Sequence, residues 1–154
     1  MVSTRGVRRL TAPQTSPSAA LTCLEPGERD TVQGPSLEAY SDIGRLLERY
    51  FLGEKVDFQY ALDLEGTPFQ LEVWGAVRTI PYGETRSYTW VARQIGRPGA
   101  ARAVGQVMRA NPVCIIVPCH RVIGARGDLC GYGGPQGIHL KQRLLDMEYR
   151  NSDK

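Results

Sequence analysis

Three short helical patterns follow one another in the middle of this 154-residue chain, each with its own start or stop signal. The first opens on Thr67-Pro68-Phe69-Gln70, where Thr can cap the helix, Pro fits its first position and Gln completes a capping box. The second begins after Ser87 and ends at Gly96. The third ends at Asn111-Pro112, because the residue before a proline is disfavoured in a helix. Two short helices joined by a Gly-containing turn predict a helix-turn-helix unit.

The last helix of this series is predicted to have a buried face and an open face. The residues of its buried face are Ala100, Ala103, Val104, Val107 and Met108. The opposite face shows Ala101, Arg102, Gly105 and Arg109. Small side chains between arginines would let this helix approach a phosphate-lined groove closely, whereas a larger side chain would hold it away. The alternative is that the small residues allow tight packing against another helix.

The positive charge of the chain is concentrated in the same region. The net charge is +3, but residues 78–126 contain eight arginines, no lysine and one acidic residue, Glu84. This segment therefore carries +7, and the rest of the chain carries −4. Such a concentration indicates a surface for a polyanion, since contacts to phosphates supply most of the non-specific affinity for nucleic acids. A solvated basic surface is the alternative.

The chain as a whole divides into segments of different character. Residues 1–35 contain four prolines among Ser, Thr and Gly, so we expect a flexible or poorly structured N-terminus. Residues 36–66 show a helical pattern and then an alternating, half-buried strand over 58–64, which we assign to a reduced N-terminal domain. Residues 67–150 are expected to form the main domain, and residues 151–154 a tail.

Two further elements are predicted within the main domain. The β-branched run Val113 to Val117 indicates a buried strand, which would deliver Pro118-Cys119-His120-Arg121-Val122 at its end. A glycine-rich loop follows over 124–137. A last helix is expected over roughly 138–149.

The cysteine and apolar patterns exclude several classes of protein. The longest apolar run, Val113 to Cys119, has seven residues and is too short to cross a membrane. The four cysteines lack the paired spacing of a zinc site, and no apolar signal segment accompanies them. They are Cys23, Cys114, Cys119 and Cys130. We therefore expect reduced thiols, no metal and a cytoplasmic or nuclear protein rather than a secreted or membrane-spanning one.

The dipeptide Cys119-His120 indicates a reactive thiol. A cysteine reacts as the thiolate and needs a neighbour that lowers its pKa or removes its proton. Because adjacent residues of an extended segment point in opposite directions, a bridging water would be needed between this thiol and the imidazole. Glu148 is the best late-chain candidate to hold the other nitrogen of the imidazole. The alternative is an inert buried cysteine beside a surface histidine.

These residues resemble the O6-alkylguanine-DNA alkyltransferase family, also called methylated-DNA–protein-cysteine methyltransferases. Pro118-Cys119-His120-Arg121-Val122 is similar to the active-site signature of that family. The other motifs that match in order and spacing are Ile80-Pro81-Tyr82-Gly83-Glu84-Thr85, Ser87-Tyr88, Ala101-Arg102-Ala103-Val104-Gly105, Asn111-Pro112 and Gly131-Tyr132. The resemblance implies an α+β fold, in which a helix-turn-helix, winged-helix-like alkyltransferase domain follows a reduced ribonuclease-H-like N-terminal region.

The resemblance also implies roles at the reacting centre. Cys119 would accept the alkyl group, and His120 would remove the thiol proton through a water molecule. Glu148 would hold the imidazole, and Asn111 would support this network. Tyr88 would donate a proton toward the base as it leaves.

A second set of residues is implied to bind DNA and the target base. Arg102 would occupy the space left by the extruded guanine. The other expected DNA contacts are Ser87, Tyr88, Ala101, Gly105 and Arg109. The residues expected to bind the guanine are Val122, Tyr132 and Gly133, together with the carbonyl group of Cys119. The carbonyl groups of Cys119 and Val122 would accept from the guanine amino group, and the Gly133 amide, in the loop after Tyr132, would donate to the O6 region.

The function implied by the resemblance is single-turnover DNA repair. A monomer would flip O6-alkylguanine, chiefly O6-methylguanine, out of double-stranded DNA and move the alkyl group irreversibly to Cys119, with no cofactor. A non-catalytic alkyltransferase-like protein that binds the lesion is the alternative, but such proteins lack the acceptor cysteine. A general thiol enzyme or redox sensor would leave the arginine-lined helix unexplained. Two departures from the family are Cys114, where a proline is common, and a slightly longer segment over 133–139.

Overall fold

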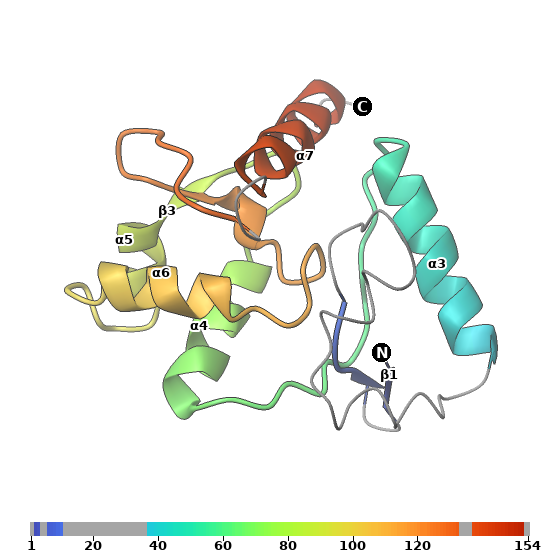
Figure 1. Cartoon of the computed structure of the whole chain (residues 1–154), viewed down its shortest axis with the longest axis horizontal. Helices are drawn as coiled ribbons and strands as arrows, with labels where there is room; N and C mark the ends of the chain where they lie inside the picture. Colours follow the sequence, from blue (N-terminus) through green and yellow to red (C-terminus); the bar gives the residue numbers. More distant parts are fainter. Residues whose placement is uncertain (1, 4–5, 11–36, 133–136, 153–154) are drawn as a thin grey trace.

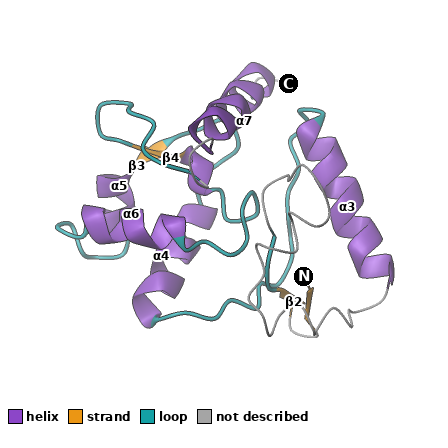
Figure 2. Ribbon diagram, in the orientation of Figure 1, coloured by secondary structure: helices purple, strands orange, loops and turns teal. Residues whose placement is uncertain are grey.

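Helices dominate the structure, a computed structural model that describes residues 2–3, 6–10, 37–132 and 137–152. The helices are α3 (Leu37–Phe51), α4 (Pro68–Arg78), α5 (Tyr88–Gln94), α6 (Ala101–Arg109), the 3₁₀ helix η1 (Cys119–Arg121) and α7 (Gly137–Asn151). The strands are β1 (Val2–Ser3), β2 (Gly6–Val7), β3 (Arg86–Ser87) and β4 (Val122–Ile123). Within the described residues, β1 pairs antiparallel with β2 and β3 pairs parallel with β4, so the fold is α+β (Figure 2).

Helices α4, α5 and α6 pack against one another on one side of the molecule (Figure 1). The predicted capping box is present: Thr67 accepts a hydrogen bond from the Gln70 amide at 3.3 Å, and the Gln70 side chain accepts one from the Thr67 amide at 2.8 Å. The Ser87 hydroxyl caps α5 by accepting a hydrogen bond from the Trp90 amide at 3.1 Å. Gly96, at φ 70°, lets the chain turn between α5 and α6. These contacts confirm the helix-turn-helix unit.

One apolar core joins these three helices. Their buried members are Val73, Trp74, Val77, Val91, Ala92, Val104, Val107 and Met108. The prediction that Ala103 is buried was wrong, because this residue is exposed. The buried stripe of α6 runs through Val104, Val107 and Met108, at the i, i+3, i+4 spacing of a helix, and leaves Ala103 beside it in solvent.

The predicted strand over 58–64 was also wrong. Its alternating side chains are half-buried as expected, but a single parallel bridge, Leu62 with Val7, pairs the segment. The Val7 amide donates to the Ala61 carbonyl at 2.8 Å, and the Asp63 amide donates to the Val7 carbonyl at 3.0 Å. A strand needs a continuous partner. Among the described residues, the only bridge to this segment comes from Val7 of β2, which is too little to make it a strand.

The run Val113 to Val117 is buried as predicted, but it forms a tight turn instead of a strand. The Val117 amide donates to the Val113 carbonyl at 2.9 Å, which closes the turn. Ile115 has φ 75°, in the left-handed region that a β-branched residue rarely adopts. The chain then enters η1, so Cys119 lies at the start of a 3₁₀ helix and not at the end of a strand.

Helix α3 lies on the far side of the molecule from α5 and α6, and α7 lies near its C-terminal end (Figure 1). Tyr50, in the last turn of α3, belongs to the core that α4, α5 and α6 share. Ile43 packs in a second cluster, whose other buried members are Val7, Val113 and Ile116. Of the N-terminal residues 1–35, the structure describes 2–3 and 6–10, which contain β1 and β2, and the rest lie outside the described residues. Helix α7 is slightly longer than predicted at both ends.

Candidate functional site

Asn111 holds together the turn that precedes the predicted nucleophile. Its Oδ1 accepts a hydrogen bond from the Val113 amide at 3.0 Å. Its Nδ2 donates to the Val117 carbonyl at 2.9 Å and to the Cys119 sulfur at 3.1 Å. Both N–H donors of this amide are used and its oxygen accepts one bond, so one side chain joins the end of α6 to both the turn and the sulfur.

Cys119 is 4% exposed and has the electrostatic surroundings of a thiolate. The hydrogen bond from the Cys114 thiol is the largest cause that lowers the pKa of Cys119. The Asn111 amide and the Lys141 ammonium lower it further, whereas burial acts in the opposite direction. A lowered pKa makes a cysteine a better nucleophile at neutral pH, because more of it is ionised.

His120 and Glu148, which the sequence analysis paired, are in direct contact. His120 Nε2 lies 2.8 Å from Glu148 Oε1, and both side chains are fully buried. Arg121 binds the same carboxylate with two hydrogen bonds, from Nε at 2.8 Å and from Nη2 at 2.9 Å. The Gly83 amide adds a third donor at 3.1 Å. Burial raises the pKa of Glu148, but the hydrogen bonds from His120 and Arg121 outweigh it and lower the pKa below its ordinary value.

These contacts fix the proton of the imidazole on one nitrogen. Because Glu148 is ionised and can only accept, His120 Nε2 must be the donor of that pair. Burial lowers the pKa of His120, so the ring is neutral at neutral pH and Nδ1 has a free lone pair. Nδ1 is buried and finds no hydrogen-bond partner among the described residues.

Tyr50 and Arg121 belong to this network, although the sequence analysis gave neither a role in it. The Tyr50 hydroxyl donates to Glu148 Oε1 at 2.6 Å and lies 3.2 Å from His120 Nε2. It comes from α3, far from the other members in the chain. In the sequence, Tyr50 shows only the helical spacing that is typical of a core residue.

Lys141 is a second residue that the sequence analysis missed. Its side chain is 1% exposed, and its Nζ donates to the Val122 carbonyl at 2.6 Å and to the Cys130 carbonyl at 3.3 Å. Burial lowers the pKa of this ammonium group. Its Nζ also lies 5.9 Å from the centre of the Tyr88 ring. Lys141 therefore joins α7 to β4 and to the loop that follows it.

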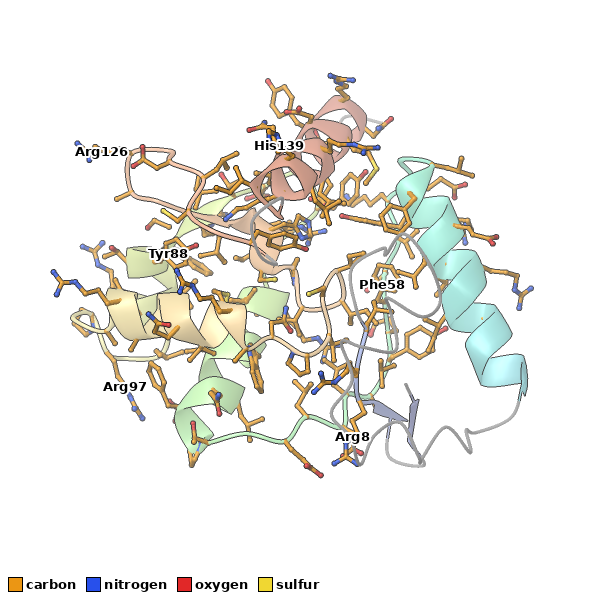
Figure 3. The ribbon with its side chains drawn as sticks, in the orientation of Figure 1. Arg8, Phe58, Tyr88, Arg97, Arg126 and His139 are labelled. Carbon is orange, nitrogen blue, oxygen red and sulfur yellow. The ribbon has the colours of Figure 1, made fainter. Side chains whose placement is uncertain are left out.

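A pocket of about 260 Å³ opens beside α6. The residues that line it are Tyr88, Ala101, Arg102, Gly105, Gln106, Arg109, Cys130 and Gly131. Five of the six predicted DNA contacts are therefore brought together, and no acidic side chain is among them. Tyr88 lies between α6 and the loop that carries Arg126 (Figure 3). Ser87, the sixth, caps α5 and does not line the pocket.

Tyr132 and Val122 are the remaining predicted site residues within the described part of the chain. The Tyr132 ring packs edge-on against His120, with ring centres 6.5 Å apart, and Val122 is fully buried. Burial is the largest cause that raises the pKa of the Tyr132 phenol. Gly133 and residues 134–136 lie outside the described residues.

Metal-binding clusters and membrane-spanning helices are both absent from the described residues. Within those ranges, no group of three or more His, Cys, Asp or Glu side chains has the geometry to hold a metal ion. None of the described helices is both long enough and apolar enough to cross a membrane.

Known proteins match this chain over the same region. Residues 68–150 match the family described as "6-O-methylguanine DNA methyltransferase, DNA binding domain". A methylated-DNA–protein-cysteine methyltransferase from Mycolicibacterium paratuberculosis is 52% identical over 128 residues, 83% of this chain and 75% of that protein. A protein of the same name from Mycobacterium bovis is 58% identical over 114 residues, 74% of this chain and 68% of that protein.

A solved structure shows the same arrangement of the chain. It is the crystal structure of Mycobacterium tuberculosis OGT in complex with DNA, which aligns with a TM-score of 0.70 at 57% identity. The alignment covers 73% of this chain and 68% of that one.

Proposed function

The chain belongs to the 6-O-methylguanine DNA methyltransferase family, and we propose that Cys119 is the residue that takes the alkyl group from an O6-alkylguanine in double-stranded DNA. The protein is a DNA repair enzyme that binds DNA and transfers an alkyl group to a cysteine. One observation carries the proposal for Cys119. Its sulfur, with a lowered pKa, accepts a hydrogen bond from Asn111 just after α6, and the next residue, His120, contacts the ionised Glu148 carboxylate.

The first step is removal of the Cys119 proton. His120 Nδ1 takes this proton through a water molecule, because Nε2 already holds a proton that it donates to Glu148. The imidazolium that forms is stabilised by the ionised Glu148 carboxylate. This arrangement supports the roles expected for His120 and Glu148.

The second step is displacement at the alkyl carbon. A carbon–sulfur bond forms with Cys119 as the carbon–oxygen bond breaks, and the electron pair leaves with the guanine. Tyr88 then donates its proton to the guanine anion. Burial is the largest cause that raises the pKa of Tyr88 to about 12, so the phenol still holds its proton at neutral pH. The product is a thioether that no group here expels, so each molecule reacts once.

The guanine is held by backbone groups near the sulfur. The Val122 carbonyl accepts one hydrogen bond from Lys141 at 2.6 Å, and its second lone pair is available for the amino group of the guanine. The Cys119 carbonyl accepts a second bond from the same amino group. The Gly133 amide, outside the described residues, is proposed to donate to the O6 atom.

DNA binds along α6, with this helix in the minor groove. The lesion must leave the base stack before the sulfur can reach its alkyl carbon. Arg102 is exposed at the rim of the pocket, and we assign it to fill the space that the base vacates. Ala101 and Gly105 allow the backbone of α6 to approach the DNA, and Arg109 and Ser87 contact phosphates.

The N-terminal region lies outside the main domain and contains α3, β1 and β2. We propose that α3 with β1 and β2 represents a reduced ribonuclease-H-like region, and that the protein acts as a monomer. The antiparallel pair β1–β2 and its bridge to Leu62 support the first proposal.

The proposed function is tested by incubation of the protein with duplex DNA that contains one O6-methylguanine, followed by analysis of the nucleosides. We expect one O6-methylguanine to become guanine for each protein molecule, and no more at longer times. The variant Cys119→Ala is expected to bind the same duplex without converting the base. Conversion by Cys119→Ala, or many conversions per molecule, would overturn the proposal.

A further inference from the structure

Tyr50 reaches the reacting centre from outside residues 68–150, the part of the chain that matches the family. It lies in the last turn of α3, and its side chain is buried. Its hydroxyl oxygen lies 2.6 Å from Glu148 Oε1 and 3.2 Å from His120 Nε2, and these two atoms are 2.8 Å apart. Three polar atoms therefore form a closed triangle, and the N-terminal region supplies one of them.

The charges in this triangle decide the direction of each hydrogen bond. Glu148 is ionised and can only accept, so both the Tyr50 hydroxyl and His120 Nε2 donate to Oε1. Burial is the largest cause that raises the pKa of Tyr50, so its hydroxyl holds a proton at neutral pH. Because this proton is directed at the carboxylate, only oxygen lone pairs of Tyr50 remain to face His120 Nε2.

Tyr50 and His120 share one carboxylate oxygen, which also accepts a hydrogen bond from Arg121. The bond from Tyr50 takes up part of the negative charge of Oε1 and fixes the orientation of the carboxylate. Without the hydroxyl, the buried carboxylate would have one donor fewer and would attract the imidazole proton more strongly. The cationic form of His120 would then be favoured, and a cationic ring has no free nitrogen with which to take a proton.

We propose that Tyr50 is a positioning residue for alkyl transfer, whose hydroxyl holds Glu148 Oε1 beside His120 and keeps the imidazole in its neutral form. The proposal rests on the function proposed above for Cys119, in which His120 Nδ1 takes the thiol proton. No atom of Tyr50 reacts, because it donates to Glu148 both before and after that proton moves. Helix α3 thus adds to the site a group that lies outside the matched domain.

Other charged and titratable groups face His120 from η1, α7 and the loop before α7. Arg121 and Lys141 are cationic at neutral pH, and both act against a second positive charge on the ring. Tyr132, which packs edge-on against His120, keeps its proton because burial raises its pKa. Cys119, whose pKa is lowered, is the neighbour that can change its charge in the same range as the imidazole.

The imidazole can be observed directly, because the chain contains only two histidines. Nuclear magnetic resonance of the full chain, labelled with nitrogen-15 in histidine, follows both ring nitrogens of His120 against pH and distinguishes a protonated nitrogen from a bare one. His139, which is exposed on α7, is the internal reference. The titration is repeated with Cys119→Ser, which separates ionisation of the imidazole from ionisation of the thiol.

Two tyrosine variants separate the contact with Glu148 from the general loss of a hydroxyl. Tyr50→Phe keeps the ring and removes the donor to Glu148. Tyr82→Phe is the matched control, because the Tyr82 hydroxyl donates instead to the Gly53 carbonyl, just after α3, at 3.1 Å. The rate of benzyl transfer from O6-benzylguanine is measured against pH in parallel.

Thermal unfolding shows whether each tyrosine variant is folded. If Tyr50→Phe is not, 3-fluorotyrosine is incorporated at position 50. It keeps the shape of the side chain, and its more acidic hydroxyl is a stronger donor, so it should move the midpoint of His120 downward. An unchanged midpoint in that protein would count against the proposal.

The expected result is a selective shift of His120. Its midpoint rises by about one pH unit in Tyr50→Phe, which makes benzyl transfer about tenfold slower below both midpoints and leaves the two rates close above them. Tyr82→Phe stays close to the wild type in both measurements.

An unchanged His120 midpoint in Tyr50→Phe would overturn the proposal, as would a transfer rate that falls equally at every pH or does not fall at all. An equal shift of the midpoint in Tyr82→Phe would also overturn it. A wild type that never takes the benzyl group would instead overturn the proposed function, and the titration would still decide whether Tyr50 acts on the imidazole.

Discussion

The Glu148 carboxylate holds the reacting centre together. It accepts hydrogen bonds from Tyr50 at 2.6 Å, from His120 at 2.8 Å, from Arg121 at 2.8 and 2.9 Å, and from the Gly83 amide at 3.1 Å. These donors keep a buried carboxylate ionised. An ionised Glu148 in turn keeps the proton of His120 on Nε2 and leaves Nδ1 as the base.

Glu148→Gln is expected to remove a pH-dependent part of the stability. The folded protein holds the pKa of Glu148 below its ordinary value of 4.5, so ionisation of this group stabilises the fold above that pH. The contribution is lost as the pH falls through the lower, folded-state pKa. The difference in free energy of unfolding between wild type and variant should therefore be constant near neutral pH and shrink below about pH 4. Chemical denaturation at several pH values measures it, and a difference that persists unchanged to about pH 3 would contradict the account.

Part of this centre could be predicted from the sequence. Cys119, His120 and Asn111 lie in motifs of fixed spacing, and Glu148 was the best acidic candidate late in the chain. Tyr50 could not be predicted, because helical spacing shows that a side chain is buried but not which polar group it meets across the core. The burial of Lys141 could not be predicted either, because a lysine is rarely buried unless it is paired.

At the scale of elements, local signals identified the helices but not the extended segments. The capping box of α4 and the Ser87 cap of α5 are written in adjacent residues, so those helices begin where predicted. The run Val113 to Val117 has the composition of a strand, yet the Asn111 side chain closes it into a turn. That choice depends on tertiary hydrogen bonds, which composition does not show.

Helix α6 is expected to tolerate a methyl group at Gly105 but not a large side chain. A Cβ there would lie 3.9 Å from the Tyr88 ring, an ordinary contact, and alanine favours a helix. Gly105→Ala should therefore raise the free energy of unfolding by up to about 1 kcal/mol. Gly105→Leu should weaken duplex binding at least tenfold, because it separates α6 from the groove, and keep the reaction with O6-benzylguanine. Fluorescence anisotropy measures the binding; equal duplex affinity for Gly105→Leu and Gly105→Ala would show that this face does not approach DNA.

Arg102→Ala is expected to separate base extrusion from chemistry. Arg102 is exposed at the pocket and lies outside the Glu148 network. Its loss should slow repair of O6-methylguanine in a duplex more than tenfold, and slow transfer from free O6-benzylguanine far less, because a free base needs no extrusion. Single-turnover rates with the two substrates make the comparison. Equal slowing of both reactions is the result that the proposed role cannot accommodate.

At the scale of the whole molecule, α3 supports a reacting centre whose other residues lie more than thirty positions away in the chain. Tyr50 packs in the core of α4, α5 and α6 and donates to Glu148 of α7. Ile43, in the same helix, packs with Val113 of the turn that Asn111 closes. The N-terminal region therefore contacts both the imidazole network and the turn before the nucleophile.

Tyr50→Phe is expected to show how strongly this region supports the site. The variant keeps the ring and removes only the hydroxyl that donates to Glu148, so the free energy of unfolding should fall by about 1–3 kcal/mol. Tyr50→Ala, which also removes the packing, should lose about 3–5 kcal/mol. Urea denaturation at neutral pH measures both. A Tyr50→Phe protein as stable as the wild type would mean that the hydroxyl adds nothing to the network.

The central claim is that one sulfur, Cys119, keeps the alkyl group of the lesion. Peptide mass analysis after reaction with a duplex containing O6-methylguanine tests it most directly. The account predicts one added methyl group per molecule, on the peptide of Cys119 and on its sulfur. A methyl group found on Cys114 or Cys130, or an unmodified protein bound tightly to the lesion, would contradict it.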